Sequence, residues 1–246
     1  MYRYLTLAPG RKDRKTGHRN AFYLAFSLYN RTRELGNTVK TGFMIKSCYS
    51  IFDSMIQLDI LAVGDLQRDE DGNILKADST SVLIRTPKHT IVVDPSTKYM
   101  RPFLKTSFKQ IGVFVKDVDI VVVTHMHHDH IENLDMFPKA KVYVHSGSDE
   151  ELPGATVVDR DVFELCEGVR LVHTPGHCPE EMSVFVDADR HYVIAGDAIP
   201  LEDNFLKNIP PRLSTDRDLA LQSIKKIRDY ADVVIPGHGF PFMTDQ

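Results

Sequence analysis

Residues 124–130 read THMHHDH and place four metal-binding side chains within six positions. In an extended backbone, side chains repeat every two residues, so His125 and His127 are expected to point to the same side. Asp129 and His130 follow at once. Imidazole nitrogens and carboxylate oxygens are donors that suit zinc or a comparable divalent ion. The segment therefore predicts metal binding by these four side chains.

Three further candidate ligands lie downstream, each after a short apolar run of the kind found in buried strands. The runs and their ligands are 169–172 with His177, 192–195 with Asp197, and 233–235 with His238. The first cluster follows the run 120–123 in the same way. A glycine directly before each later ligand lets the backbone turn sharply. Because strand ends collect at one edge of a sheet, we expect the four segments to meet there.

Seven candidate ligands are more than one four-coordinate ion uses. We divide them between two ions, with Asp197 shared, because a carboxylate has two oxygens. The first ion is assigned His125, His127 and His177, and the second is assigned Asp129, His130 and His238. Two ions about 3.5–4 Å apart bring the pKa of a bound water toward neutrality, so the expected nucleophile is a bridging hydroxide. Zinc is the expected metal, with iron or manganese as alternatives, and Asp129 is the expected catalytic residue.

The ordered motifs resemble those of the metallo-β-lactamase fold superfamily. Its H-x-H-x-D-H motif is present at residues 125–130, and its three later ligand motifs appear in order at His177, Asp197 and His238. The resemblance covers the chain from Met55 to the C-terminus. It implies an α+β chain folded as a four-layer αββα sandwich with a dinuclear metal site, usually of zinc. It also implies the same division of the seven ligands.

Two short stretches of sequence point to a particular group within this superfamily. DHIENL at 129–134 and PGHGFPF at 236–242 are similar to the metallo-β-lactamase domain-containing protein 1 group. Many relatives carry glycine where this chain carries Glu132, so Glu132 is expected to reach the metals or to add negative charge beside them. Antibiotic hydrolysis is not expected, because the commonest zinc β-lactamases use a cysteine at the position of Asp197.

The charge of the chain changes sharply near residue 54. Residues 1–54 hold ten Lys and Arg against three Asp and Glu, whereas residues 55–246 hold twenty against thirty-one. Regular strand and helix patterns begin only after Met55. We therefore expect a metallohydrolase domain at 55–246 and a basic N-terminal extension at 1–54, unstructured or upstream of the true start. A targeting peptide is less favoured because no clear apolar core or cleavage site is present, and an arm for an anionic partner is a third interpretation.

Strand and helix signals alternate after residue 55. Strands are expected at 58–63, 81–85, 90–94, 120–123, 141–145, 169–173, 183–186, 192–195 and 233–235. Helices are expected at 99–111 and 215–230, the second with a capping box formed by Thr215 and Asp218. Many strands with few helices favour two stacked sheets covered by helices.

Several residues outside the seven ligands have expected supporting roles. Asp94 stands at a strand end before Pro95 and is expected to hold the ligand loop by accepting hydrogen bonds. His128 faces away from His125 and His127, so it is expected to be solvated or to support the ligands. Asn204 follows the Asp197 loop and is a weaker candidate for a contact with substrate.

Together these signals predict a metal-dependent hydrolase that cleaves an ester, thioester, lactone or phosphodiester bond in a small-molecule or nucleotide-like substrate. The alternatives are a mononuclear iron dioxygenase acting on a persulfide, a metal-dependent ribonuclease, and a non-catalytic scaffold. Nucleic acid is the less favoured partner because the main domain is acidic. No apolar run is long enough for a membrane helix, and a homodimer is compatible with the sequence. Three cysteines without a C-x-x-C pair favour a reducing, cytoplasmic location.

Overall fold

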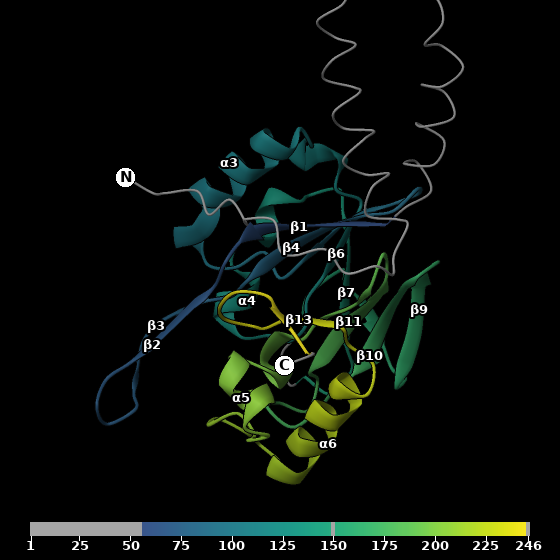
Figure 1. The fold of residues 1–246 in the computed structure, drawn as a ribbon. Coiled ribbons are helices and arrows are strands. Elements are labelled where there is room, and N and C mark those ends of the chain that lie inside the picture. Colours follow the sequence, from purple (N-terminus) through teal and green to yellow (C-terminus); the bar gives the residue numbers. More distant parts are fainter. Residues whose placement is uncertain (1–55, 149–150, 245–246) are drawn as a thin grey trace, which may run out of the picture. The chain divides into compact units, whose positions relative to one another are not determined.

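The computed structural model describes residues 56–148 and 151–244. The predicted basic extension at 1–54 and the predicted start at Met55 lie outside the described residues. The described part contains two six-stranded sheets and a two-stranded hairpin. Figure 1 shows how helices lie on the outer side of each sheet. None of the helices in these two ranges has the length and apolar character needed to cross a bilayer.

The first sheet is mixed. In spatial order its strands are β1 (Gln57–Ala62), β4 (Ser81–Arg85), β5 (Thr90–Val93), β6 (Ile120–Val122), β7 (Lys141–His145) and β8 (Thr156–Val158). The first three strands pair antiparallel, which confirms the predicted hairpin. From β5 to β8 the strands run parallel, so each crossover passes over the sheet before the next strand begins.

The second sheet is mainly antiparallel. In spatial order its strands are β14 (Phe242–Met243), β13 (Val233–Ile235), β12 (His191–Ile194), β11 (Met182–Asp187), β10 (Val169–His173) and β9 (Val162–Cys166). Only β12 and β13 pair in parallel. A separate hairpin of β2 (Asp65–Arg68) and β3 (Ile74–Asp78) leaves the first sheet between β1 and β4, and Figure 1 shows it projecting from the body.

Two longer helices cover the sheets, α3 (Arg101–Ile111) on the first and α6 (Arg217–Arg228) on the second (Figure 1). The shorter elements are α4 (His128–Ile131), α5 (Glu202–Leu206), η1 (Lys98–Met100), η2 (Val115–Asp117), η3 (Leu134–Met136) and η4 (Gly196–Ala198). The helix predicted at 215–230 exists, but the predicted capping box at Thr215 is wrong. Asp216 is the N-cap, and its carboxylate accepts hydrogen bonds from the backbone of Asp218 and Leu219 at 2.9 Å each.

The strands of each sheet alternate between two apolar layers. Val82 and Ile84 of β4 lie in the central layer, together with residues of the second sheet such as Leu171 and Val184. Leu83, between them, faces the opposite way and packs with side chains of α3. Each such buried side chain contributes about 1.5–3 kcal/mol to folding.

The second sheet follows the same rule. Phe185 of β11 turns away from the central layer and packs with Ile224 and Ile227 of α6. The layers therefore run helix, sheet, sheet, helix, which confirms the predicted αββα sandwich of class α+β. The hairpin β2–β3 and the short strands β8, β9 and β14 were not predicted, because their mixed polar composition or small length gives no clear period.

Candidate metal centre

The four predicted ligand segments meet at one edge of the two sheets. Strands β12 and β13 run parallel with Ile194 opposite Ile235, so the loops that carry Asp197 and His238 leave side by side. Strand β10 points the same way as β12, because both pair antiparallel with β11, and it leads to His177. The ligand loop after β6 joins this edge through a hydrogen bond from the Met182 amide to the Thr124 carbonyl at 2.9 Å.

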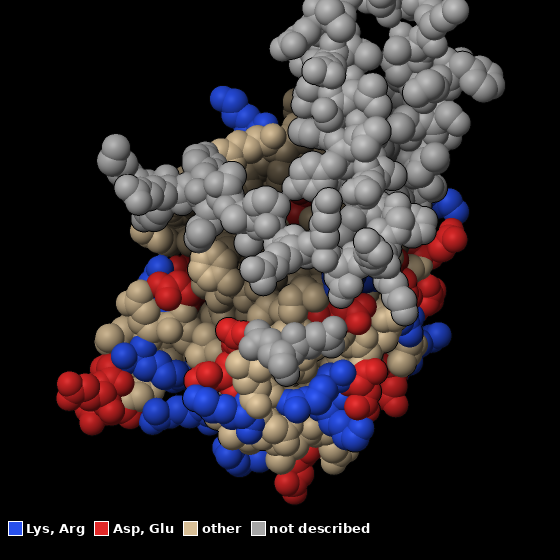
Figure 2. Space-filling model, in the orientation of Figure 1, with Lys and Arg blue, Asp and Glu red and all other residues tan. Residues whose placement is uncertain are grey.

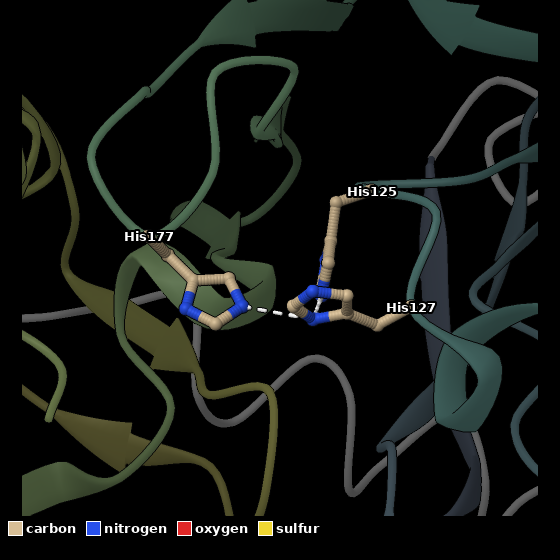
Figure 3. Close-up of side chains that lie close together, drawn as sticks. All are labelled: His125, His127 and His177. Carbon is tan, nitrogen blue, oxygen red and sulfur yellow. Dashed lines mark hydrogen bonds between the residues drawn. The ribbon is translucent and has the colours of Figure 1, made fainter. Parts of the chain in front are cut away.

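Three histidines form the first cluster, which we name the nitrogen group (His125, His127 and His177). Figure 3 shows the three rings converging from two loops. His127 Nδ1 lies 3.0 Å from His125 Nε2 and 3.0 Å from His177 Nε2. Donors bound to one tetrahedral zinc at ~2.0–2.1 Å are ~3.3 Å apart, so this spacing suits one ion.

A second cluster contains a carboxylate, and we name it the mixed group (Asp129, His130 and His238). Asp129 Oδ2 lies 3.7 Å from His130 Nε2 and 3.6 Å from His238 Nε2. The ligand atoms of this group lie within 4.8 Å of one another, as do those of the nitrogen group. The two clusters correspond to the two ions that the sequence predicts.

Asp197 lies between the two groups. Its Oδ1 is 3.3 Å from His238 Nε2 and 3.7 Å from His130 Nε2 in the mixed group. Its Oδ2 is 3.6 Å from His177 Nε2 in the nitrogen group. Each oxygen therefore faces a different cluster, as a shared ligand requires.

The ring orientation of four histidines is fixed from outside the centre. In four of the five rings Nε2 faces the centre, and Nδ1 contacts an acceptor behind the ring. The acceptors are Glu181 Oε2 for His125 at 3.3 Å, Asp94 Oδ2 for His130 at 2.8 Å, the Leu213 carbonyl for His177 at 2.7 Å and the Asp78 carbonyl for His238 at 2.8 Å. Such contacts set the tautomer and aim the free nitrogen at a metal.

Two buried carboxylates support these rings. Asp94 accepts from the Thr124 amide at 2.8 Å and from the Thr124 hydroxyl at 2.7 Å, in addition to His130, which confirms its predicted role. Its φ of 47° is left-handed, a conformation that costs ordinary residues free energy and is held here by these bonds. Glu181 accepts from the Asp197 amide at 3.0 Å and was not predicted, because no spacing rule links it to the ligands.

The pKa values divide along the same line as the two groups. Burial lowers the pKa of His125 well below 6.5, and burial followed by the charge of His177 lowers that of His127. Burial also opposes protonation of His130, but the charge and hydrogen bond of Asp94 outweigh it and raise the pKa to about 10. His238 behaves alike: burial lowers its pKa, and Asp197 raises it overall.

Burial and neighbouring charges also shift the pKa values of the carboxylates in the centre. Burial favours a neutral Asp197, but the charges of His238, His130 and His177 hold its pKa well below 3.8. Burial and the charge of Asp197 raise the pKa of Glu181 well above 4.5. The centre therefore favours positive charge, which a proton on His130 supplies and a bound cation would also supply.

The residues present fit a pair of bound cations. His130 Nε2 and Asp197 Oδ1 are buried in the centre without a hydrogen-bond partner. A buried polar atom without a partner costs free energy, and a metal bond would remove that cost. The ring nitrogens and carboxylate oxygens are the donors that zinc uses. The backbone of Gly237 packs against Asp197, where an added Cβ would lie 2.1 Å from Oδ1, so a side chain at this position would displace the carboxylate.

Three further predictions concern residues beside the ligands. Glu132 was expected to reach the metals or to add charge there; its Oε2 instead accepts from the Lys98 amide at 2.8 Å. His128 is exposed, as expected. Asn204 donates to the carbonyls of Ile209 and Pro210 at 3.2 and 3.3 Å, so it holds its own loop.

The sequence of this chain matches a known protein family and several of its members. A model of the metallo-beta-lactamase superfamily matches residues 76–164. Over 196 residues the chain is 39% identical to a "probable metallo-hydrolase" of Methanocaldococcus jannaschii, a match covering 79% of this chain and 93% of that protein. Over 192 residues it is 32% identical to metallo-beta-lactamase domain-containing protein 1 of Xenopus laevis, covering 71% and 76%.

A solved structure shares the fold. It is a quorum-quenching N-acyl homoserine lactone hydrolase with a TM-score of 0.62 and 20% sequence identity. The match covers 75% of this chain and 93% of that one. At this identity the likeness concerns the arrangement of the layers alone.

Proposed function

The chain belongs to the metallo-beta-lactamase superfamily and is a metal-dependent hydrolase, and on that premise we propose that it binds two divalent ions, preferably zinc, and cleaves a small-molecule ester, thioester, lactone or phosphodiester. The nitrogen group would hold one ion and the mixed group the other. Asp197 would be shared between them.

The position of Asp197 is the observation that carries this proposal. Its two oxygens face different clusters at 3.3–3.7 Å from the nearest ring nitrogens. A purely structural zinc site is closed, four-coordinate and usually rich in cysteine. Here none of the seven ligand candidates is a cysteine, and the centre opens into a cavity lined by His127, Asp129, His177, Asp197 and His238.

Two divalent ions, when bound, supply an acidified water and polarise the substrate oxygen. The chain's own residues position the reaction. Asp129 has a side chain 19% exposed, against 12% for Asp197, so of the two carboxylates that line the cavity it is the more accessible. We assign to Asp129 the orientation of the attacking water and the acceptance of its proton.

The surroundings of His238 offer room for a substrate. The cavity over the ligands is small, about 60 Å³. A groove of about 620 Å³ adjoins it and shares His238 as a lining residue. Leu201, Phe240 and Phe242 give this groove apolar walls, so an organic substituent could lie there while the scissile bond lies over the ligands.

Metal analysis together with a substrate panel tests the proposal. The purified protein is assayed for zinc, iron and manganese, and then with 4-nitrophenyl acetate, γ-butyrolactone, acetyl-coenzyme A and bis(4-nitrophenyl) phosphate. We expect two ions per chain and turnover of at least one compound, lost on chelation and restored by zinc. Two bound ions with no turnover of any of the four would contradict the proposed hydrolysis.

A second function, a mononuclear iron dioxygenase, is favoured by one observation. His125, His130 and Asp197 form a third set of mutually close ligand atoms. Two histidines with one carboxylate are the pattern typical of non-haem iron(II) oxygenases. One iron per chain and oxygen uptake with glutathione persulfide would establish this function and exclude the dinuclear one.

A further inference from the structure

Two arginines line the cavity over the metal ligands. Arg68 ends strand β2, and Arg212 lies in the segment between α5 and α6. Both contribute to the wall of the cavity that contains Asp129 and Asp197. Neither arginine belongs to a motif of the metal centre, and neither was predicted from the sequence.

Main-chain contacts hold the two guanidinium groups at the β2–β3 hairpin. Arg68 Nη1 donates to the Gly72 carbonyl at 3.0 Å, and Arg212 Nη2 donates to the Asp71 carbonyl at 3.0 Å. Gly72 has a left-handed φ of 86°, and a Cβ there would lie 1.9 Å from Arg212 Nη1. The turn therefore needs glycine both for its backbone and for the close approach of Arg212.

Among the residues that the structure describes, no ion pair includes Arg68 or Arg212. Lys76 on the adjacent strand differs, since it pairs with Asp65 at 3.1 Å and with Asp78 at 3.0 Å. Figure 2 shows Lys and Arg side chains gathered beside the acidic tip of the hairpin.

Each guanidinium has donors to spare. Arginine carries five N–H donors in a planar fork that matches the two oxygens of a carboxylate or phosphate. The bonds to Gly72 and Asp71 leave most of those donors available, and carbonyl acceptors do not cancel the charge. Leu66, Ile74 and Leu213 supply apolar surface around the two groups.

We propose that Arg68 and Arg212 bind an anionic oxygen group of the substrate, a carboxylate or a phosphate, on the hairpin side of the cavity over the metal ligands. The inference rests on the proposed hydrolase function, because it takes the bound anion to be part of the substrate. It narrows the substrate class to organic anions with an apolar portion.

Anion binding tests the inference without relying on turnover. The Kd of inorganic phosphate and of acetate is measured by calorimetry for the wild type and for Arg68→Gln/Arg212→Gln, with the metal content of each sample determined. We expect the double variant to bind at least one anion about tenfold more weakly at unchanged metal content, since charge-assisted contacts are lost. If the double variant binds only phosphate more weakly, the anionic group of the substrate is a phosphate. If it binds both anions more weakly, the arginines form a general site for oxygen anions.

Arg190→Gln is the matched control. Arg190 is exposed and directly precedes β12, at the end away from Asp197, so Arg190→Gln removes one positive charge, as Arg68→Gln alone does, without touching the cavity. Equal affinities in the double variant and the wild type would overturn the inference, and so would wild-type protein that binds neither anion. If the double variant does not fold, Arg68→Gln alone decides, because Arg68 bonds only within its own hairpin. The metal content of the wild type reports separately on the proposed function.

A kinetic comparison separates binding from a structural role. 4-Nitrophenyl octanoate and mono-4-nitrophenyl suberate have acyl chains of equal length, and only the second ends in a carboxylate. We expect the double variant to raise KM for the suberate about tenfold with little change in kcat, and to leave both constants for the octanoate unchanged. A similar loss with both esters would show that the arginines only hold the hairpin.

Discussion

The nitrogen group offers three imidazoles, whereas the mixed group combines a carboxylate with two imidazoles and lies beside Asp94. In the nitrogen group, burial lowers the pKa values of His125 and His127, so these rings are neutral at physiological pH. In the mixed group, carboxylates raise the pKa values of His130 and His238 against the effect of burial. Burial thus leaves His125 and His127 without a proton and free to bind a metal, whereas the nearby carboxylates allow His130 and His238 to keep one.

Because of this difference, binding of the mixed-group ion would release a proton from a histidine, and binding of the nitrogen-group ion would release less. A ligand must lose its proton before it binds a metal. An ion in the nitrogen group would meet the neutral rings of His125 and His127, while an ion in the mixed group would replace a proton that Asp94 and Asp197 stabilise. Substitutions and changes of pH can test this distinction, beginning with the residue that both groups share.

Replacing Asp197 should abolish the distinction altogether. Asp197→Ala removes both oxygens that face the groups, so we expect both ions to be lost and hydrolysis to fall by more than the ~10–100-fold typical of a supporting residue. Metal content and kcat/KM measure the effect, with the exposed Asp159→Ala as the control. A variant that retains two ions and near-normal turnover would show that Asp197 is not shared.

Replacing the supporting carboxylates should affect the groups unequally. Asp94→Asn removes the charge that faces His130, so we expect the affinity for the mixed-group ion to fall ~10–100-fold. Glu181→Gln should cost less, because burial and the charge of Asp197 raise the pKa of Glu181 and so already disfavour its charged form. Zinc titrations of both variants give the two affinities, and equal losses would contradict the assignment.

Raising the pH should act on the mixed group. In metal-free protein the pKa of His130 is about 10, against 6.5 when unfolded, so its contribution to stability is complete below pH 6.5 and is lost as the pH rises through 10. We therefore expect the Tm of metal-free protein to fall between pH 7 and pH 10.

Zinc binding should release the proton that His130 carries in metal-free protein. At pH 7, calorimetry in buffers of different ionisation enthalpy should detect about one proton released from His130 per mixed-group ion. His177→Ala isolates this step, because that variant lacks one nitrogen-group ligand, and His238→Ala isolates the other. Equal proton release in the two variants would remove the contrast between the groups.

The sequence predicted the candidate ligands better than the residues that hold them or line the cavity. All seven candidate ligands lie in segments that follow a strand end, where residue type and position carry the signal, and the structure brings all seven together. Asp94 was found because it ends a strand. Glu181, Arg68 and Arg212 were not found, because their roles depend on contacts between segments far apart in the chain.

The fold shows the same limit. Buried strands such as β6 and β13 are uniformly apolar and were predicted closely. The β2–β3 hairpin was missed because its sequences DLQR and ILKAD are half exposed and match neither a core strand nor a helix. Packing that lies outside the core leaves little pattern in a single sequence.

The smallest effect is expected at His128, which neighbours a ligand but is not one. His127 and His128 are both exposed, so exposure does not separate them. Orientation does, because His127 Nδ1 lies 3.0 Å from two nitrogens of its group, whereas no described ligand contact includes His128. We expect His128→Ala to change zinc affinity and kcat/KM by less than about twofold, as surface substitutions do. His127→Ala should instead lower the nitrogen-group affinity strongly. Equal losses in the two variants would mean that His128 takes part in the centre.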